Sequence, residues 1–264
     1  MLLAIDIGNT TITLGLWDGQ QWRFQWRLRT IHDQTVDEYG IYLKMLLREE
    51  GLADAVDGVV LSSVVPPLTR TFVAVASRYL GQEPLLVTAA TDTGIRIATE
   101  NPAEVGADRI VNAAAAYHLY PGASIVVDMG TATTLDVVSA DGALLGVVIA
   151  PGLQLAADAL TQRAAQLGRV SLEAPPQVLG RNTVHAMQSG LIFGYAGLIE
   201  GLVARLRTEL ELPDARVIGT GGLIGRMVPH TGVISCVEPW LTLKGLRLIA
   251  ERAGYSTTAL SSRE

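Results

Sequence analysis

The sequence predicts an α/β protein built from two similar lobes. The first observation is a phrase that occurs twice: residues 4–10 (AIDIGNT) and residues 126–131 (VVDMGT) each end an apolar strand with Asp and continue into a glycine turn with hydroxyl side chains. The second is the order of elements, because each copy lies at the start of a run of three strands followed by a helix. The third is composition, since 49% hydrophobic and 17% charged residues indicate a folded core.

Apolar periodicity predicts the elements of the first half in order. Three strands come first, and a helix follows because Tyr39, Leu43 and Leu47 recur at helical spacing until Gly51 ends the pattern. A buried strand then leads to Pro66, which opens a second helix before the next strand. The expected ranges are strands 2–7, 11–17, 21–29, 58–65 and 84–88, and helices 36–50 and 66–80.

The second half opens on a helix-start pattern. Asn101 is a suitable N-cap, Pro102 suits the first helical position, and Glu104 completes a capping box. The strand pattern of the first half then repeats. The expected ranges are helices 101–120, 153–167, 183–211 and 241–253, a short helix after residue 222, and strands 123–129, 132–138, 143–150, 215–219 and 233–237. This order predicts two lobes, 1–117 and 118–264, with a hinge near the 101–120 helix.

One helix of the second half has an unusual composition. In the expected 183–211 helix, Gly190, Gly194, Gly197 and Gly201 recur mostly at three- and four-residue spacing. They therefore lie on one face, to which another backbone can come close. This face is a candidate for contact between two copies of the chain.

Charge and composition narrow the class of partner. A net charge of −6 and a pI near 5.3 argue against nucleic acid or an anionic membrane surface as the main partner. The single cysteine, Cys236, fits a reducing compartment. The apolar stretch 143–157 is interrupted by a Pro-Gly pair and is too short to span a bilayer. We therefore expect a cytoplasmic protein without membrane association.

Lysine is scarce in this chain. Lys44 and Lys244 are the only two, and neither lies in a glycine-rich turn. A Walker-type loop needs such a lysine to reach the β- and γ-phosphates. Phosphate binding would have to depend on backbone N–H groups, hydroxyls, arginine and a metal ion.

The two repeated turns carry the chemistry of a nucleotide site. An acid at the end of a strand, as Asp6 and Asp128 are, can hold a metal ion, and the following glycine turn can bind phosphate oxygens through its N–H groups. A single copy would be explained better as an ordinary hairpin turn, and the threonines could be simple strand formers. The repetition favours function. Gly219-Thr220-Gly221-Gly222 adds a third glycine turn between a strand and a helix.

A further acid lies on the expected 101–120 helix. Asp108 could accept a proton from a hydroxyl during phosphoryl transfer, and Arg109 could bind a substrate carboxylate. Asp108 and Asn112 are i,i+4 neighbours and share one side of the helix. The spacing alone favours a solvated helix face with a salt bridge, so both interpretations stay open at this point.

Together these motifs resemble a known family. Two Asp-x-Gly hairpins and a Gly-Thr-Gly-Gly turn resemble the superfamily of actin, heat-shock chaperones and sugar kinases. The fuller set resembles type III pantothenate kinase, in the right order from residue 1 to about residue 250: residues 6–10, 101–109, 128–134, 151–152, 180–183 and 219–222. The fold that this resemblance implies is two ribonuclease-H-like (actin-like ATPase) lobes, each a mixed five-stranded sheet with flanking helices, with an ATP cleft between them.

The resemblance also implies an activity: ATP-dependent phosphorylation of pantothenate to 4'-phosphopantothenate, the first step of coenzyme A biosynthesis, by a cytoplasmic homodimer. Asp108 would be the general base, and Asp128 would coordinate a monovalent cation, K⁺ or NH4⁺. Asp6 would hold Mg²⁺ through water. The residues expected to bind ATP are Asp6, Ile7, Gly8, Asn9, Thr10, Thr11, Ile12, Thr13 and Thr131, and those expected to bind pantothenate are Gly106, Ala107, Asp108, Arg109 and Thr183.

One position departs from the family pattern. Members often carry Tyr three residues before the Pro of the Asn-Pro motif, whereas this chain has Thr99. Whether this position contacts pantothenate, as the tyrosine of the family does, is therefore left open by the sequence. Two alternatives also remain at this point: another kinase or a polyphosphate-hydrolysing phosphatase of the same superfamily, and a non-catalytic regulator that kept the fold.

Overall fold

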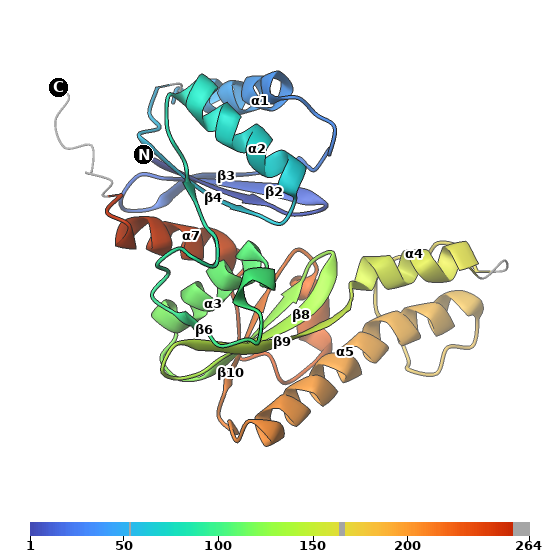
Figure 1. Cartoon of the computed structure of the whole chain (residues 1–264). Helices are drawn as coiled ribbons and strands as arrows, with labels where there is room; N and C mark the ends of the chain where they lie inside the picture. The colour runs from blue at the N-terminus through green and yellow to red at the C-terminus, as the bar shows by residue number, and fades with distance from the viewer. Residues whose placement is uncertain (53, 164–166, 256–264) are drawn as a thin grey trace. The chain divides into compact units, whose positions relative to one another are not determined.

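The computed structural model describes residues 1–52, 54–163 and 167–255 (Figure 1). The chain forms two compact units. One contains Met1–Ala115 together with the segment that begins at Thr242, and the other contains Ala116–Leu241. Each unit has a sheet, helices and an apolar core, which confirms the expected α/β class. The lobe boundaries 1–117 and 118–264 remain a prediction; the compact units differ from them in grouping the C-terminal segment with the N-terminal unit.

The first sheet is mixed and has five strands in the order β3-β2-β1-β4-β5. β1 is antiparallel to β2, and β2 to β3, whereas β1-β4 and β4-β5 are parallel. Because β1 is central, its last residues have a neighbour on both sides: Asp6 lies opposite Thr13 of β2 and Ser62 of β4. The strands are β1 (Leu2–Ile7), β2 (Thr11–Trp17), β3 (Trp22–Arg29), β4 (Gly58–Ser63) and β5 (Leu85–Leu86).

Helices pack on both faces of this sheet (Figure 1). α1 (Val36–Glu49) and α2 (Pro66–Val75), which continues as a π-helix over Ala76–Leu80, form a core with the strands. α1 begins at Thr35, which forms the capping box with Glu38. The last helix, α7 (Leu241–Arg252), lies on the other face, where Leu243 occupies the space that a side chain at Gly15 would need.

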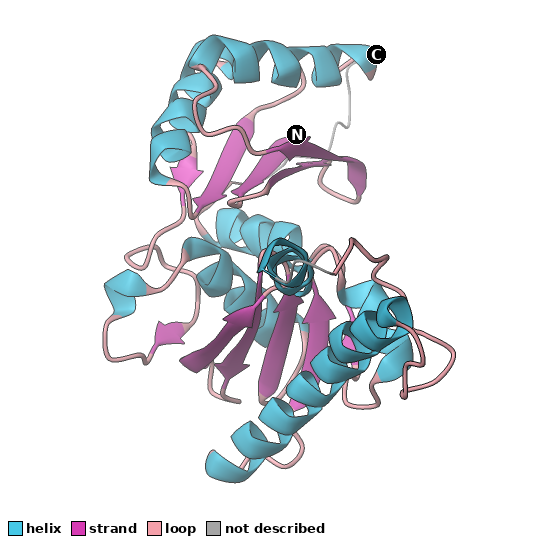
Figure 2. Cartoon of the chain, turned by 90° about the vertical axis from the view of Figure 1, so that its right-hand side faces the viewer, coloured by secondary structure: helices cyan, strands magenta, loops and turns pink. Residues whose placement is uncertain are grey.

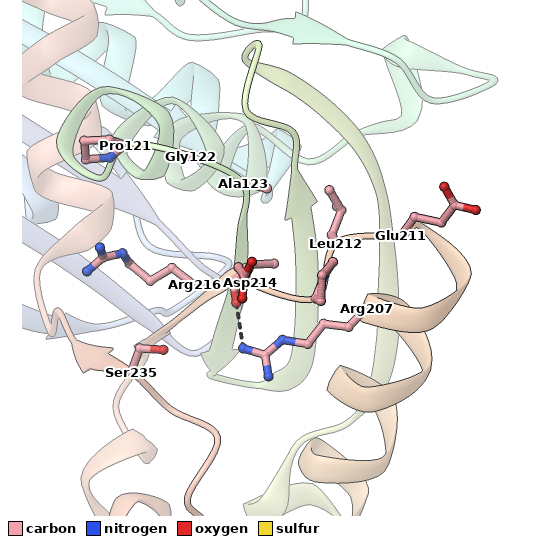
Figure 3. A pocket seen from close by; sticks show the side chains of 11 residues that line it. Pro121, Gly122, Ala123, Arg207, Glu211, Leu212, Asp214, Arg216 and Ser235 are labelled. Carbon is pink, nitrogen blue, oxygen red and sulfur yellow. Dashed lines mark hydrogen bonds between the residues drawn. The ribbon is translucent and has the colours of Figure 1, made fainter.

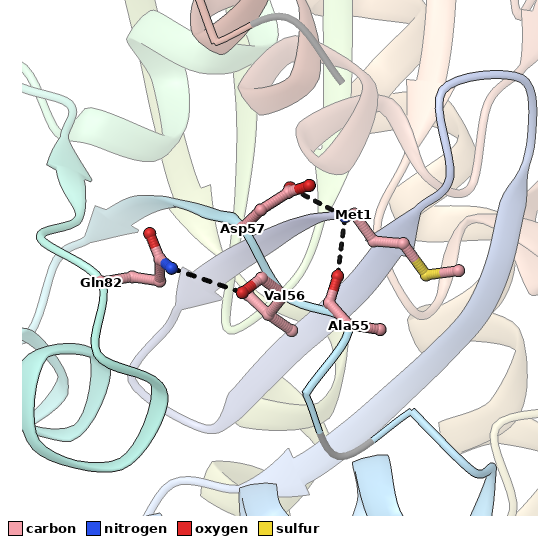
Figure 4. Close-up of polar contacts among 5 residues, drawn as sticks. All are labelled: Met1, Ala55, Val56, Asp57 and Gln82. Atoms are coloured by element: carbon pink, nitrogen blue, oxygen red, sulfur yellow. Dashed lines mark hydrogen bonds and ion pairs between the residues drawn. The ribbon is translucent and has the colours of Figure 1, made fainter. Parts of the chain in front are cut away.

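The start of β1 is fixed by polar contacts (Figure 4). The Met1 amine donates to the Ala55 carbonyl and pairs with the Asp57 carboxylate, both at 2.7 Å. Gln82 donates to the Val56 carbonyl at 3.4 Å in the same segment. These contacts hold the chain just before β4 beside the start of β1, in the register that places Ser62 opposite Asp6.

The second sheet repeats the pairing of the first. Its order is β11-β10-β7-β8-β9-β6, and β7 is antiparallel to β8 but parallel to β10, as β1 is to β2 and β4. Asp128 lies opposite Thr134 of β8 and Thr220 of β10. The strands are β6 (Arg96–Ile97), β7 (Ser124–Met129), β8 (Ala132–Val138), β9 (Ala143–Pro151), β10 (Arg216–Thr220) and β11 (Cys236–Val237). This sheet has six strands rather than the expected five, because β6 was not predicted.

Three helices pack on the second sheet. They are α4 (Leu153–Arg163), α5 (Thr183–Glu209) and α6 (Ile224–Met227), and a 3-10 turn (Val228–His230) follows. α5 crosses one face of the sheet (Figure 2). It is long and apolar enough to span a membrane, but one side is buried in the core, with Ile192 and Ile199 fully covered. Its apolar residues are therefore explained by packing inside the unit.

The expected helix 101–120 is wrong at its start. Pro102–Glu104 form a separate 3-10 turn, Asn101 makes no side-chain cap, and Val105 is extended. The α-helix, α3, begins only at Ala107 and ends at Leu119. The proline does begin a turn, but the predicted cap and capping box are wrong, and the break at Val105 places Asp108 in the first turn of α3. Residues 164–166 of the expected 153–167 helix lie outside the described residues.

Candidate functional site

The first glycine turn lies between β1 and β2 and is held from two directions. The Gly8 N–H donates to the Thr11 carbonyl at 3.1 Å, which closes the hairpin. Thr30, at the end of β3, donates its hydroxyl to the Gly8 carbonyl at 2.7 Å and its N–H to the Thr10 carbonyl at 3.0 Å. Asn9 and Thr10 are exposed at the tip, while Asp6 is half-buried beneath it. The turn is therefore a fixed, outward-facing backbone loop.

The Asp6 carboxylate has a defined contact. The Ser62 hydroxyl donates to Asp6 Oδ1 at 2.7 Å. A short bond from a neutral hydroxyl to a carboxylate is among the stronger hydrogen bonds in proteins. The expectation that this acid stands at the end of a strand beside the glycine turn is matched by its position, whereas its role in ATP and magnesium binding stays a prediction.

Asp108 lies against the backbone at the start of α3. The Arg109 N–H donates to Asp108 Oδ1 at 2.9 Å. A Cβ atom at Gly106 would stand 2.6 Å from the same oxygen and 3.3 Å from Cγ1 of Val64. The carboxylate therefore occupies the space that any other residue at 106 would fill. The Gly-Ala-Asp-Arg sequence works as one unit, since the glycine makes room for the acid.

Two effects of opposite sign act on the acidity of Asp108. Burial raises the pKa of its carboxyl and is the largest effect, while the Arg109 N–H and the Arg109 charge lower it. The net result is a pKa above the ordinary value of an aspartate. A carboxylate of raised pKa is a better proton acceptor, as long as it is still ionised at the working pH.

Asn112 does not share the environment that its i,i+4 spacing suggested. It is 1% exposed and accepts a hydrogen bond from Thr242 of α7 at 2.8 Å. Asn112 therefore joins α3 to α7 inside the first unit. Arg109 is partly buried beside Asp108, so the solvated-face interpretation of this helix does not hold.

In the second unit, Asp128 lies against the third glycine turn. A Cβ atom at Gly221 would stand 2.4 Å from Asp128 Oδ1 and 2.6 Å from the Met129 N atom. Gly221 also has φ +91°, a conformation that favours glycine. The Leu223 N–H donates to the Met129 carbonyl at 3.1 Å and links the two turns. The structure therefore brings together two motifs that the sequence separates by about ninety residues.

The turn that carries Thr131 has a second neighbour, the Pro151-Gly152 pair. A Cβ atom at Gly152 would stand 2.1 Å from the Thr131 carbonyl oxygen. Tyr195 of α5 donates its hydroxyl to the Pro151 carbonyl at 2.9 Å and lies 3.3 Å from that of Gly152. The long helix thus fixes the backbone on which the Thr131 turn lies. The Pro-Gly pair is recognisable in the sequence, whereas the role of Tyr195 appears only in the fold.

Thr183 stands away from this cluster. It occupies the exposed first turn of α5, after the N-cap Asn182. Twelve residues separate it from Tyr195, which corresponds to roughly 18 Å along a helix. Thr183 begins the same helix face that carries the glycines, and a Cβ atom at Gly190, Gly194 or Gly197 would meet no atom within 4 Å.

A hollow lies elsewhere in the second unit (Figure 3). It has a volume of about 670 Å³ and is lined by the last turn of α5 and the starts of β7 and β10, including Arg207 and Arg216. Asp128 lies at the other end of β7, so this hollow contains none of the expected site residues. Within the described residues, no three His, Cys, Asp or Glu side chains form a metal-binding group.

Comparison with known families gives one match over most of the chain. The family described as type III pantothenate kinase matches residues 2–205. A type III pantothenate kinase of Moorella thermoacetica is 48% identical over 253 residues, covering 96% of this chain and 99% of the relative. A type III pantothenate kinase of Thermomicrobium roseum is 50% identical over 260 residues, covering 98% of this chain and 100% of the relative.

Solved structures are similar at the level of the fold. A Campylobacter jejuni protein described as a Baf family transcriptional activator superposes with a TM-score of 0.62 at 19% identity, covering 96% of this chain and 99% of that one. The activator of 2-hydroxyisocaproyl-CoA dehydratase from Clostridium difficile, with bound ADPNP, superposes with a TM-score of 0.56 at 14% identity. The match covers 100% of this chain and 99% of that one. At these low identities, the TM-scores show a shared fold and no shared activity.

The contact between Gly221 and Asp128 yields a stability prediction. Gly221→Ala and Gly122→Ala introduce the same strain, because both glycines have φ +91°, but a Cβ at Gly122 meets nothing within 4 Å. We expect Gly122→Ala to cost about 1–2 kcal/mol for the left-handed conformation. Gly221→Ala should cost roughly 1–3 kcal/mol more, from overpacking against Asp128. Urea unfolding of both variants measures the difference, and equal losses would contradict the contact.

Proposed function

Because the chain belongs to the type III pantothenate kinase family, and so phosphorylates pantothenate in coenzyme A biosynthesis, we propose how its residues carry out that reaction. The primary hydroxyl oxygen of pantothenate attacks the γ-phosphorus of ATP in line with the leaving ADP. The hydroxyl proton passes to the Asp108 carboxylate. The products are 4'-phosphopantothenate and ADP, and the reaction is the first step of the pathway.

The observation that carries this proposal is the environment of Asp108. Its carboxylate lies over Gly106, is oriented by the Arg109 N–H, and has a pKa raised by burial. Phosphoryl transfer depends mainly on positioning and charge neutralisation. An acid that is held in one place and made more basic suits the removal of a proton from an alcohol.

The phosphates of ATP are assigned to the first hairpin and to Thr131. The full set is Asp6, Ile7, Gly8, Asn9, Thr10, Thr11, Ile12, Thr13 and Thr131. The support is the fixed tip between β1 and β2, whose backbone Thr30 holds from behind, because a pre-formed turn binds an anion without a large ordering cost. Asp6 would hold Mg²⁺ through water, and the metal would neutralise charge on the β- and γ-phosphates.

A monovalent cation, K⁺ or NH4⁺, is assigned to Asp128. The donors that this turn offers to a cation are oxygens, from the Asp128 carboxylate and from the carbonyls and hydroxyls of residues 129–134. Oxygen donors suit hard cations, so the residues fit such an ion. Its charge would take the place of the lysine that a Walker-type loop supplies.

Pantothenate is assigned to Gly106, Ala107, Asp108, Arg109 and Thr183. Arg109 would bind the substrate carboxylate through its planar guanidinium group. The Thr99 hydroxyl is buried and has no hydrogen-bond partner among the described residues. We propose that Thr99 leaves the family's tyrosine contact unfilled and gives a roomier pocket at that point.

We further propose a cytoplasmic homodimer that contacts through the glycine face of α5. Gly190, Gly194 and Gly197 are exposed and have open space in front of them. A face without side chains allows two helices to approach closely. The proposal gives a reason for glycines in a helix, where each costs about 1 kcal/mol relative to alanine.

The role of Asp108 is tested with Asp108→Asn. We expect kcat to fall by about 10²–10⁴-fold, as for a lost general base, while Glu104→Gln, an exposed acid on the preceding turn, leaves it unchanged. In the wild type, kcat/KM for pantothenate should fall at acid pH with an apparent pKa above that of an ordinary aspartate. Coupled turnover assays across pH measure both, and near-normal turnover of Asp108→Asn would remove the residue from this role.

The same substitution should not destabilise the fold. A folded-state pKa raised by burial means that Asp108 binds its proton more tightly in the folded chain than in the unfolded one. The contribution of Asp108 to the free energy of unfolding favours the folded state at acid pH. It is lost as the pH rises through the folded-state pKa of the carboxyl. At neutral pH the charge therefore opposes folding, and Asp108→Asn should keep or raise the Tm in a thermal melt.

The cation assignment is tested with Asp128→Asn. The amide keeps the shape of the side chain but loses the charge, so we expect the KCl concentration for half-maximal activity to rise at least about 10-fold. KCl titrations of turnover, at constant ionic strength and saturating pantothenate, measure the shift. A potassium curve that coincides with that of the wild type would exclude this site.

The dimer assignment is tested with Gly194→Leu. The new side chain meets nothing inside the unit, so the fold should persist while the dimer dissociation constant rises at least about 10-fold. Gly225→Leu, at an exposed helical glycine with equally open surroundings, is the matched control. Analytical ultracentrifugation over a range of concentrations measures both, and a wild-type chain that stays monomeric would contradict the proposal.

A further inference from the structure

The end of β4 contains a buried hydroxyl that the reaction as described does not use. β4 reads Gly-Val-Val-Leu-Ser-Ser, and Ser62 is 0% exposed. A buried hydroxyl in an apolar strand needs a hydrogen-bond partner. Its partner is Asp6, whose Oδ1 atom accepts from Ser62 Oγ at 2.7 Å.

The position of Ser62 follows from the sheet rather than from the sequence. The parallel pairing of β1 with β4 places Ser62 directly opposite Asp6, although the two are 56 residues apart. The second sheet repeats this arrangement, since Thr220 of β10 lies opposite Asp128. In both sheets, the residue beside the acid on the parallel neighbour strand therefore carries a hydroxyl.

The residues after Ser62 extend the contact toward Asp108. The Val64 N–H donates to the Ile7 carbonyl at 3.0 Å, and Val64 Cγ1 lies against Gly106, over which the Asp108 carboxylate is folded. Ser63 holds this segment in place, because its hydroxyl accepts from the Val65 N–H at 3.1 Å and from the Thr69 hydroxyl at 2.8 Å. One short segment thus touches the surroundings of both acids in the first unit.

We propose that Ser62 is a positioning residue for Asp6: its hydroxyl fixes the carboxylate in the orientation that receives the magnesium-bound nucleotide. The hydrogen bond from Ser62 restricts rotation of the Asp6 side chain about χ1 and χ2, and each alternative orientation of the carboxylate lowers the fraction of molecules ready to bind. The bond holds Oδ1 on the side of β4. This inference rests on the proposed role of Asp6 in nucleotide binding.

The test compares Ser62→Ala with Ser124→Ala. Both remove a hydroxyl from a serine that is at most 1% exposed, but Ser124 Oγ has no hydrogen-bond partner among the described residues. We expect Ser62→Ala to weaken binding of MgADP about 10-fold in calorimetric titration and to raise KM for MgATP similarly, with KM for pantothenate unchanged. Ser124→Ala should leave all three values as in the wild type, and Ser62→Thr should recover most of the loss.

A double-mutant cycle separates positioning from a general loss of structure. In the Asp6→Ala background, Ser62→Ala should weaken MgADP binding less than about 2-fold further, because the side chain that the Ser62 hydroxyl orients is no longer there. An equal 10-fold loss in both backgrounds, or unchanged MgADP binding by Ser62→Ala alone, would overturn the inference. If instead wild-type protein does not turn over pantothenate, the proposed function fails, and the binding cycle still reports on Ser62.

Discussion

In each unit, a candidate acid depends on the close approach of its carboxylate to backbone that carries no side chain. Asp108 lies over Gly106, and Asp128 lies against Gly221, in each case within 2.6 Å of where a Cβ atom would be. A side chain at either glycine would displace the carboxylate from this position. The absence of a side chain at these two glycines leaves the space that each carboxylate occupies. The glycines are therefore as necessary to the position of the acids as the acids themselves.

The internal repeat explains why the two halves supply similar parts. Each sheet has a central strand that ends in an acid, an antiparallel hairpin partner and a parallel neighbour, and each acid has hydroxyl residues opposite it on both sides. The surroundings then diverge. The first unit carries Asp108 at a helix start, while the second carries the long helix α5, whose Tyr195 fixes the turn beside Thr131. The two sheets thus share one framework but carry different residues at their edges.

The sequence predicted most of the strands and helices, because apolar periodicity and the Gly and Pro positions are local signals. It predicted the acids and the glycine turns for the same reason. It failed at residues 101–106, where a cap pattern belonged to a 3-10 turn, and at β6, which is only two residues long. Ser62 and Tyr195 escaped notice because their importance comes from pairing and packing across the fold, and the Ser-Ser end of an apolar strand was the one local hint.

The discontinuous first unit has a consequence for synthesis on the ribosome. Leu246 and Ile249 of α7 are buried in that unit, and a Cβ atom at Gly245 would stand 2.3 Å from the Val111 carbonyl oxygen of α3. The N-terminal strands therefore emerge first. They lack α7, the helix that covers one face of their sheet, until residues 241–252 have been translated. The second unit, made in between, occupies the ribosome for on the order of 10 seconds. During that interval the nascent sheet lacks the helix that covers one of its faces, so apolar side chains on that face stay exposed to water.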